Sequence, residues 1–345
     1  MKRCRKLLLV LVLSIATIVC SACNRSHVKT NPTIDDGRIK IGFTFDTFVI
    51  ERWERDRDIF VSRANELGAD VNIQTANGDV EEQKKQIEYF IEQDMDVIVI
   101  VPVDCGTLAD EVKAAKDRGI KVISYDRLIE NADVDLYISF DNSMVGKLMG
   151  QSLADDGNNE NNIIMVSGPT TDGNVIMVDD GFNEVVESTG YNIVDVTYID
   201  GWKQELAYDY ISDNKDTVKK ANVIMCGNDA LAGQVILALQ ENNMANDYVV
   251  LGQDADLDAC QRIVEGTQYM TVYKPIDELA NSAADCAIKL AQNEKLDFTA
   301  KLNNGKNYID YIAIKPVAVT KKNMDSVIID GGFHLKDEVY LNVKK

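Results

Sequence analysis

The chain has 345 residues, of which 46% are hydrophobic and 27% are charged, a composition typical of a folded globular protein with room for two lobes. These values exclude a disordered chain, a collagen-like fibre and a small disulfide scaffold. The 36 Lys and Arg residues against 56 Asp and Glu residues give a formal net charge of −20, which would repel a nucleic-acid backbone over most of the surface.

The first predicted element is an export signal over residues 1–22. Basic residues near the start precede a mostly apolar run, Leu7–Val19, that is too short for a bilayer span of about 20 residues. The segment ends in Cys20-Ser21-Ala22-Cys23, which is similar to a bacterial lipobox with Cys23 as the lipidated residue, although Cys20 stands where Leu is usual. Plain secretion and a Cys-x-x-Cys redox pair are the alternatives. Residues 23–37 are polar and predict a tether.

A first series of short apolar runs and amphipathic stretches follows the tether. The run Val97–Val101 is wholly β-branched and predicts a strand buried on both faces. The alternation predicts βαβ units and a parallel sheet. The expected strands are 39–45, 71–76, 97–101, 121–125 and 136–140, and the expected helices are 51–67, 80–93 and 108–117.

Around Asp141 the alternation starts again. The expected strands are 163–166, 193–199, 223–226, 249–252 and 269–272, and the expected helices are 145–153, 175–187, 205–212, 230–239 and 257–264. No linker rich in Pro, Gly or Ser separates the two series. The sequence therefore predicts an α/β fold of two similar, doubly wound parallel-sheet lobes joined by short strands.

Polar and aromatic residues follow most of these strands. Ligands of open parallel sheets bind beyond the carboxyl ends of the strands, so these residues are the candidates for a site. Carboxylate and guanidinium groups can each engage two neighbouring hydroxyls, and an indole face covers the apolar side of a pyranose ring. The set is therefore suited to a neutral polyol; it comprises Asp46, Asp126, Arg127, the stretch 168–174, Trp202, Asn228 and Asp254.

Single residues of this set also have purely structural interpretations. Trp53 could belong to the core of a helix face, Asp126-Arg127 could be a surface ion pair, and Asn228 would be a good helix N-cap in any fold. Lys274-Pro275 could merely end a strand.

Motifs of catalysis and metal binding are missing from the sequence. It contains no Gly-x-Gly-x-x-Gly, Walker A, Gly-x-Ser-x-Gly or His-Glu-x-x-His pattern, and only two histidines, His27 and His334. Among enzymes, only a carbohydrate hydrolase with paired carboxylates is left as an alternative. Asp254-x-Asp256-x-Asp258 imitates a calcium loop, but Ala259 occupies the position that needs Gly, which favours a helix start instead. We expect no cofactor and no metal.

Four cysteines remain beyond the tether, each in or beside an apolar segment. Their spacing fits no zinc site, and both disulfides and free buried thiols are compatible with the sequence. They are Cys105, Cys226, Cys260 and Cys286.

Several motifs in register connect the chain to a known family. Between about Arg38 and His334 the chain resembles the D-xylose-binding branch of the periplasmic binding proteins, which serve bacterial ABC sugar importers. The resemblance is carried by Glu51-Arg52-Trp53, Asp56-Arg57-Asp58-Ile59-Phe60, Tyr125-Asp126-Arg127, Gly252-Gln253-Asp254-Ala255-Asp256, Thr271-Val272-Tyr273-Lys274-Pro275 and Leu302-Asn303-Asn304-Gly305.

The resemblance implies a two-lobed clamp that the chain crosses three times and that closes on one pentose, with D-xylose as the expected ligand. It implies an N-terminal lobe of residues 38–141 and about 275–313, and a C-terminal lobe of residues 142–274 and about 314–345. The sugar-binding residues that it implies are Arg52, Trp53, Asp126 and Arg127 from the first lobe, Asp172, Asn174, Trp202, Asn228 and Asp254 from the second, and Lys274 at a crossing.

The resemblance also implies a monomer that delivers sugar to an ABC permease. The lipobox departs from the family, many of whose members float free in a periplasm, and it predicts that a lipid holds this protein on the extracellular face of the cytoplasmic membrane. The alternative partner is a membrane histidine kinase, which would make the protein a sugar sensor. A repressor with the same clamp would need a helix-turn-helix where the export signal stands.

Overall fold

The computed structural model describes residues 37–49, 52–155, 162–244 and 248–343. The predicted signal peptide, Cys23 and nearly all of the tether lie outside these residues. In the described part, no helix is long and apolar enough to cross a membrane.

The first sheet has seven strands, in the order β11-β12-β5-β4-β3-β1-β2. All neighbours are parallel except β11 and β12. The strands are β1 (Lys40–Phe45), β2 (Asp70–Thr75), β3 (Val97–Ile100), β4 (Lys121–Tyr125), β5 (Leu136–Phe140), β11 (Ala300–Asn303) and β12 (Tyr308–Ile314).

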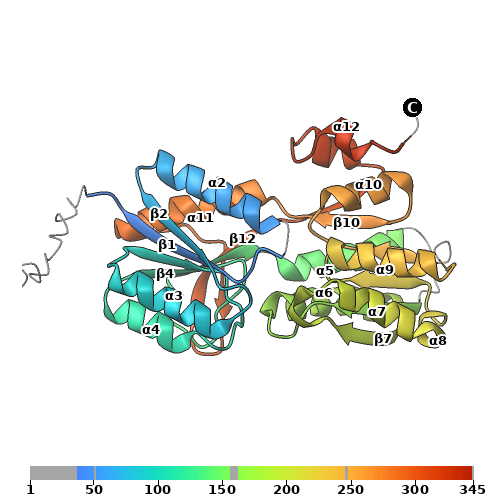
Figure 1. Cartoon of the computed structure of the whole chain (residues 1–345), viewed down its shortest axis with the longest axis horizontal. Coiled ribbons are helices and arrows are strands. Elements are labelled where there is room, and N and C mark those ends of the chain that lie inside the picture. The colour runs from blue at the N-terminus through green and yellow to red at the C-terminus, as the bar shows by residue number, and fades with distance from the viewer. Residues whose placement is uncertain (1–36, 50–51, 156–161, 245–247, 344–345) are drawn as a thin grey trace, which may run out of the picture. The chain divides into compact units, whose positions relative to one another are not determined.

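Helices cover both faces of this sheet, which explains its apolar strands. Figure 1 shows α2 (Arg52–Glu66) and α11 (Ile276–Ala291) on one face, and α3 (Val80–Glu92) and α4 (Ala109–Asp117) on the other. Alternate residues of β3 serve the two cores: Val97 and Val99 pack with α2 and α11, whereas Ile98 and Ile100 pack with α3 and α4. The prediction of a strand buried on both faces is therefore confirmed.

The second sheet has six strands, in the order β13-β10-β9-β8-β6-β7. Only β13 is antiparallel to its neighbour. The strands are β6 (Asn162–Ser167), β7 (Asn192–Tyr198), β8 (Val223–Cys226), β9 (Val249–Leu251), β10 (Met270–Tyr273) and β13 (Val317–Thr320).

The helices of the second lobe again form separate cores on the two faces of the sheet. One core includes α5 (Asn142–Asp155) and α6 (Gly173–Thr189), and the other includes α7 (Glu205–Asp213) and α9 (Asp229–Glu241). A further core joins α10 (Leu257–Glu265) to the C-terminal segment. Shorter elements are the 3₁₀ turn Asp200–Trp202, α8 (Lys215–Val218), the π-helical turn Asp325–Ile329 and α12 (Lys336–Val339).

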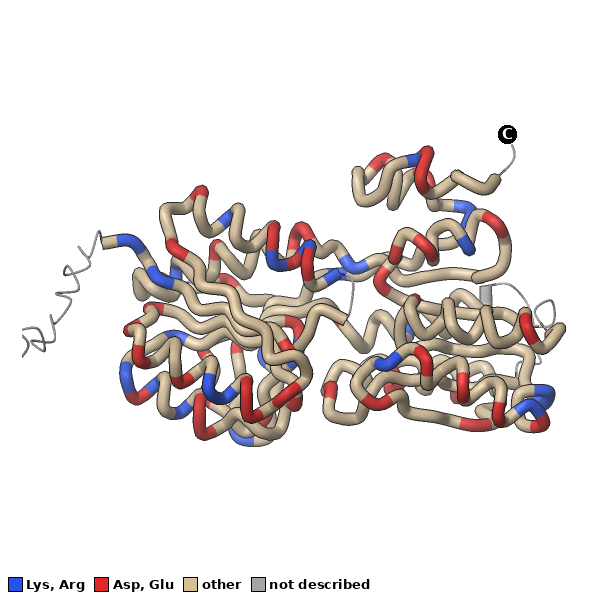
Figure 2. The backbone as a smooth tube through the Cα atoms, viewed as in Figure 1, with Lys and Arg blue, Asp and Glu red and all other residues tan. Residues whose placement is uncertain are grey.

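The chain passes between the two sheets three times, after β5, after β10 and after β12. The predicted fold class, two parallel-sheet α/β lobes, is confirmed. The expected elements end at residue 272, so the structure adds α11, β11, β12 and β13, and with them one antiparallel edge strand in each sheet. The exact division of residues between the lobes stays a prediction. Acidic residues are spread over the helices and loops around both sheets (Figure 2).

Helices α5 and α6 are in backbone contact. A Cβ atom on Gly146 would lie 1.9 Å from the carbonyl oxygen of Val178, and one on Gly181 would lie 2.1 Å from that of Ser143. Only glycine fits at these two positions. The contact ties α5, which begins at the first crossing, to α6, whose N-terminus borders the cavity described next.

Candidate functional site

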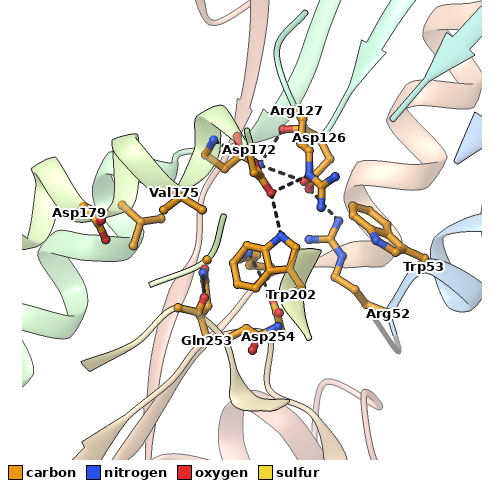
Figure 3. A pocket seen from close by; sticks show the side chains of 16 residues that line it. Arg52, Trp53, Asp126, Arg127, Asp172, Val175, Asp179, Trp202, Gln253 and Asp254 are labelled. Carbon is orange, nitrogen blue, oxygen red and sulfur yellow. Dashed lines mark hydrogen bonds and ion pairs between the residues drawn. The ribbon is translucent and has the colours of Figure 1, made fainter. Parts of the chain in front are cut away.

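A cavity with about 460 Å³ of space between the atoms is lined by residues from the loops and helices of both lobes. All ten residues that the family resemblance implied line it, whereas Asp46, a candidate from its strand end, is not in the lining. Figure 3 shows how Arg52, Trp53, Asp126 and Arg127 lie on one side of Trp202, and Val175 and Asp179 on the other. The lining residues that sequence reasoning missed are Val175, Val178, Asp179, Gly227 and Gln253.

Arg52 opens helix α2 and is buried with two carboxylates. Its guanidinium lies 2.8 Å from Asp126 and 3.2 Å from Asp56, and its Cζ is 4.2 Å from the centre of the Trp53 ring. Stacking of a guanidinium on an indole is favourable in itself. Trp53 is only 1% exposed and belongs to the first core while it also lines the cavity, so both interpretations of this residue apply.

Arg127 connects the two lobes through carboxylates. It lies 2.6 Å from Asp46 of the first lobe and 2.7 Å from Asp172 of the second. Both Asp126 and Arg127 are buried, and each pairs with a group other than its sequence neighbour. The interpretation of Asp126-Arg127 as a surface ion pair is therefore wrong.

Asp172 and Asn174 lie at the start of α6. Asp172 caps the helix by accepting a hydrogen bond from the backbone N–H of Asn174 at 3.0 Å. The Asn174 side chain donates to Asp126 Oδ1 at 3.0 Å and accepts from Asn142 at 3.0 Å. A second set of contacts thus joins the lobes beside the cavity.

The Trp202 indole forms a wall of the cavity. Its Nε1 donates to Asp172 at 3.3 Å, and its six-membered ring lies against Gly168, where a Cβ atom would be 2.3 Å from the nearest ring carbons. Gly201 and Trp202 both have positive φ, 58° and 57°, which aims the ring inward from the end of β7. The close approach requires glycine at position 168.

The remaining predicted residues lie at the ends of β8, β9 and β10. Asn228 accepts a hydrogen bond from the N–H of Leu231 at 2.9 Å, so it caps α9 and lines the cavity at once. Asp254, with a φ of 103°, lies 3.0 Å from Lys274, and both side chains are buried. Next to them, Gln253 Oε1 has no hydrogen-bond partner.

The charges of the lining nearly balance. Asp126, Asp172 and Asp254 each pair with one of the three cations, Arg52, Arg127 and Lys274; the fourth carboxylate is Asp179. Burial raises the pKa of Asp126, but the charges of Arg52, Lys274 and Arg127 outweigh this effect and hold that pKa below its ordinary value. The lining therefore has no positive charge left for an anionic ligand. It offers ionised acceptors, fixed donors and two indoles, which suits a neutral ligand rich in hydroxyl groups.

The described part of the chain bears on the calcium-like pattern and on the cysteines. No group of three or more His, Cys, Asp or Glu side chains is gathered there as a metal site would require, and the calcium-like pattern opens α10. The four described cysteines are buried and unpaired.

Comparison with known proteins identifies the family. The sequence profile of the periplasmic binding protein domain matches residues 41–295. The D-xylose-binding periplasmic protein of Haemophilus influenzae is 42% identical, over 88% of this chain and 92% of its own length. That of Escherichia coli is 39% identical, over 95% of this chain and all of its own.

Solved structures agree with this assignment. The carbohydrate-transporter solute-binding protein of Chloroflexus aurantiacus, in complex with D-glucose, has a TM-score of 0.80 and 26% identity over 87% of this chain and 98% of its own. The ABC-transporter solute-binding protein of Clostridium phytofermentans, with β-D-glucose, has a TM-score of 0.79 and 25% identity over 87% and 99%. Sequence, fold and cavity therefore lead to one conclusion: the chain is a member of the periplasmic binding protein family, and a binding protein rather than an enzyme.

Proposed function

We propose that this protein works outside the cytoplasm, where it captures a monosaccharide, preferentially D-xylose, in the cavity around Trp202. It then delivers the sugar to an ABC permease in the membrane. The observation that carries the proposal is the lining of that cavity, which contains three pairs of a carboxylate with a cation and two indoles. The names of the two D-xylose-binding relatives, at 42% and 39% identity, support the choice of pentose.

The ten residues have complementary tasks in this proposal. Asp126, Asp172 and Asp254 accept hydrogen bonds from sugar hydroxyls, and the faces of the indoles cover the ring. Arg52, Arg127, Lys274, Asn174 and Asn228 are the donors. Hydrogen bonds to charged groups contribute about 1.5–3 kcal/mol each. A few of them suffice for the ~8 kcal/mol that corresponds to micromolar affinity after the cost of ordering.

Sugar binding is coupled to closure of the lobes. Arg127 with Asp172 and Asp126 with Asn174 already bring groups from the two lobes within hydrogen-bond distance. A sugar that contacts both lobes binds the closed arrangement more tightly than the open one, and so shifts the population toward it. The permease then recognises the joint surface of the closed lobes.

Isothermal titration calorimetry of residues 24–345 against D-xylose, L-arabinose, D-ribose and D-glucose tests the proposal. We expect saturable binding with D-xylose the tightest ligand. Trp202→Ala should weaken it at least about tenfold, the effect of one lost 1.4 kcal/mol contact. Tyr308→Ala, which removes an aromatic side chain that is 70% exposed and is not part of the lining, is the matched control. No saturable heat with any of the sugars would contradict the proposal.

The lipid anchor is a separate part of the proposal. Cys23→Ser in the full-length chain should release the protein from membranes without a change in sugar affinity, because the residues that line the cavity begin at Arg52. Detergent partitioning of cell fractions measures this, and unchanged membrane retention would place the anchor elsewhere. Signalling to a histidine kinase, the alternative to transport, stays a prediction that no observation favours.

A further inference from the structure

Asp179 differs from the other carboxylates that line the cavity. It lies about two turns into α6 from Asp172, and it is 7% exposed. Ser167 donates a hydrogen bond to its Oδ1 at 2.8 Å, whereas its Oδ2 has no hydrogen-bond partner. The other lining carboxylates each have a cation within 3.0 Å, but Asp179 has none among the described residues.

The surroundings of Asp179 are mostly apolar. Val175 lies with Asp179 on the far side of Trp202 from Arg52 (Figure 3), and Val178 also lines the cavity. A buried carboxylate oxygen without a donor destabilises the protein because it has lost its hydration without a replacement hydrogen bond. A donor from a bound molecule would remove that cost, and hydroxyl groups are the donors that a sugar brings.

On the premise of the proposed sugar-binding function, we propose that Asp179 is a further ligand-contacting residue, whose free oxygen accepts a hydrogen bond from one sugar hydroxyl and thereby selects for that hydroxyl. It stands outside the set that the family resemblance implies. The contact would extend the site beyond the Trp202 wall and would give the second lobe an additional contact with the ligand.

If Asp179 contacts the sugar, the sugar affinity should depend on the protonation of Asp179. Burial raises its pKa to about 6, although the hydrogen bond from Ser167 and the nearby Tyr198 hydroxyl act to lower it. Tyr198 of β7 and Asp180 of α6 are the ionisable groups that act on it, and the paired charges of Asp172, Arg127 and Lys274 border the same cavity. A hydroxyl donor favours the ionised form, so sugar affinity should rise with pH through about 6 and fall as Asp179 takes up a proton.

The test compares Asp179→Asn with Asp180→Asn, its exposed neighbour, which removes the same charge from the same helix. We titrate D-xylose and its monodeoxy analogues calorimetrically at about pH 5 and pH 7.5. Loss of one charge-assisted hydrogen bond should weaken D-xylose binding about 10- to 100-fold in Asp179→Asn at the higher pH. Asp180→Asn should stay within about twofold of wild type.

Two further results should accompany the loss. Wild type should discriminate against one monodeoxy analogue, and Asp179→Asn should lose that discrimination while it keeps the others. The pH dependence between about pH 5 and pH 7.5 should be present in wild type and Asp180→Asn and flattened in Asp179→Asn.

An Asp179→Asn protein that folds, as checked by circular dichroism, and binds every sugar like wild type would overturn the inference and leave the proposed function intact. Absence of sugar binding in wild type would overturn both. If Asp179→Asn fails to fold, wild type alone decides: pH-independent affinity overturns the inference, and an affinity gain through about pH 6 with proton release supports it.

Discussion

Replacement of Gly168 by alanine would test whether the position of the Trp202 indole sets the depth of the cavity. The new Cβ atom would lie 2.3 Å from two carbons of the indole and 2.7 Å from a third. Carbon atoms in contact are about 3.5–4.0 Å apart, so the ring has to move by roughly 1.2–1.7 Å toward the space that the ligand needs.

Two costs follow from this displacement. The hydrogen bond from Trp202 Nε1 to Asp172 is 3.3 Å long already and would not survive it. Overpacking of this kind costs about 1–3 kcal/mol, and a lost hydrogen bond to a carboxylate about 1.5–3 kcal/mol. We therefore expect D-xylose affinity to fall about 10- to 100-fold, with a loss of no more than about 3 kcal/mol in the free energy of unfolding.

Calorimetry measures the affinity, and intrinsic fluorescence offers an independent reading. Both tryptophans of the chain line the cavity, so the whole tryptophan signal comes from this site. Gly173→Ala is the control: it adds a Cβ atom near the same site with only an ordinary contact, 3.8 Å from Cys105. In a Trp202→Phe background, which has a shorter ring, Gly168→Ala should have little effect. An equal loss in both backgrounds, or no loss in either, would refute the reasoning.

Three further changes test the packing and the charges. Asp254→Asn leaves the buried Lys274 without its countercharge and should lower the free energy of unfolding by about 3–5 kcal/mol in denaturant titrations. The control Asp310→Asn breaks the partly exposed pair with Lys301 and should cost less than about 1 kcal/mol. Equal losses in the two variants would count against the buried pair. Gly146→Ala forces α5 from α6 and should lower the melting temperature by the equivalent of about 3 kcal/mol; an unchanged transition would contradict the backbone contact. Because the pKa of Asp179 is raised from 3.8 to about 6, its contribution to the free energy of unfolding is fully present below about pH 4 and is lost as the pH rises through 6. Between pH 4 and pH 7.5, Asp179→Asn should therefore gain on the order of 2 kcal/mol of stability relative to wild type. An equal difference between the two proteins at both pH values would refute the assignment.

Seven of the ten proposed residues could be placed from the sequence because parallel strands put their carboxyl ends at one edge of a sheet. The roles of Arg52, Trp53 and Lys274 came from the family resemblance instead. Strand periodicity located those ends well: β4 was expected at 121–125 and forms Lys121–Tyr125. The residues directly after those ends, such as Asp126 and Asn228, can then be identified as lining residues without knowledge of any tertiary contact.

The partners of these residues could not be predicted in the same way. The adjacency of Asp126 and Arg127 suggested that they pair with each other, whereas Arg127 reaches Asp172 of the other lobe. Asp179 is inside a helix, and only the course of α6 along the cavity brings it into the lining. Gln253 could have been found from its place beside Asp254 after β9. Gly168 and Gly227 matter through the ring that covers them, which no local pattern reveals.

The glycine contact between α5 and α6 has a mechanical consequence. Helices whose backbones are in contact at two points cannot slide or rotate independently, so α5 and α6 move as one rigid unit. The pair begins at the first crossing, where Asn142 donates a hydrogen bond to Asn174, two residues from Asp172. A rotation of a few degrees at the crossing therefore moves the Asp172 carboxylate together with both helices.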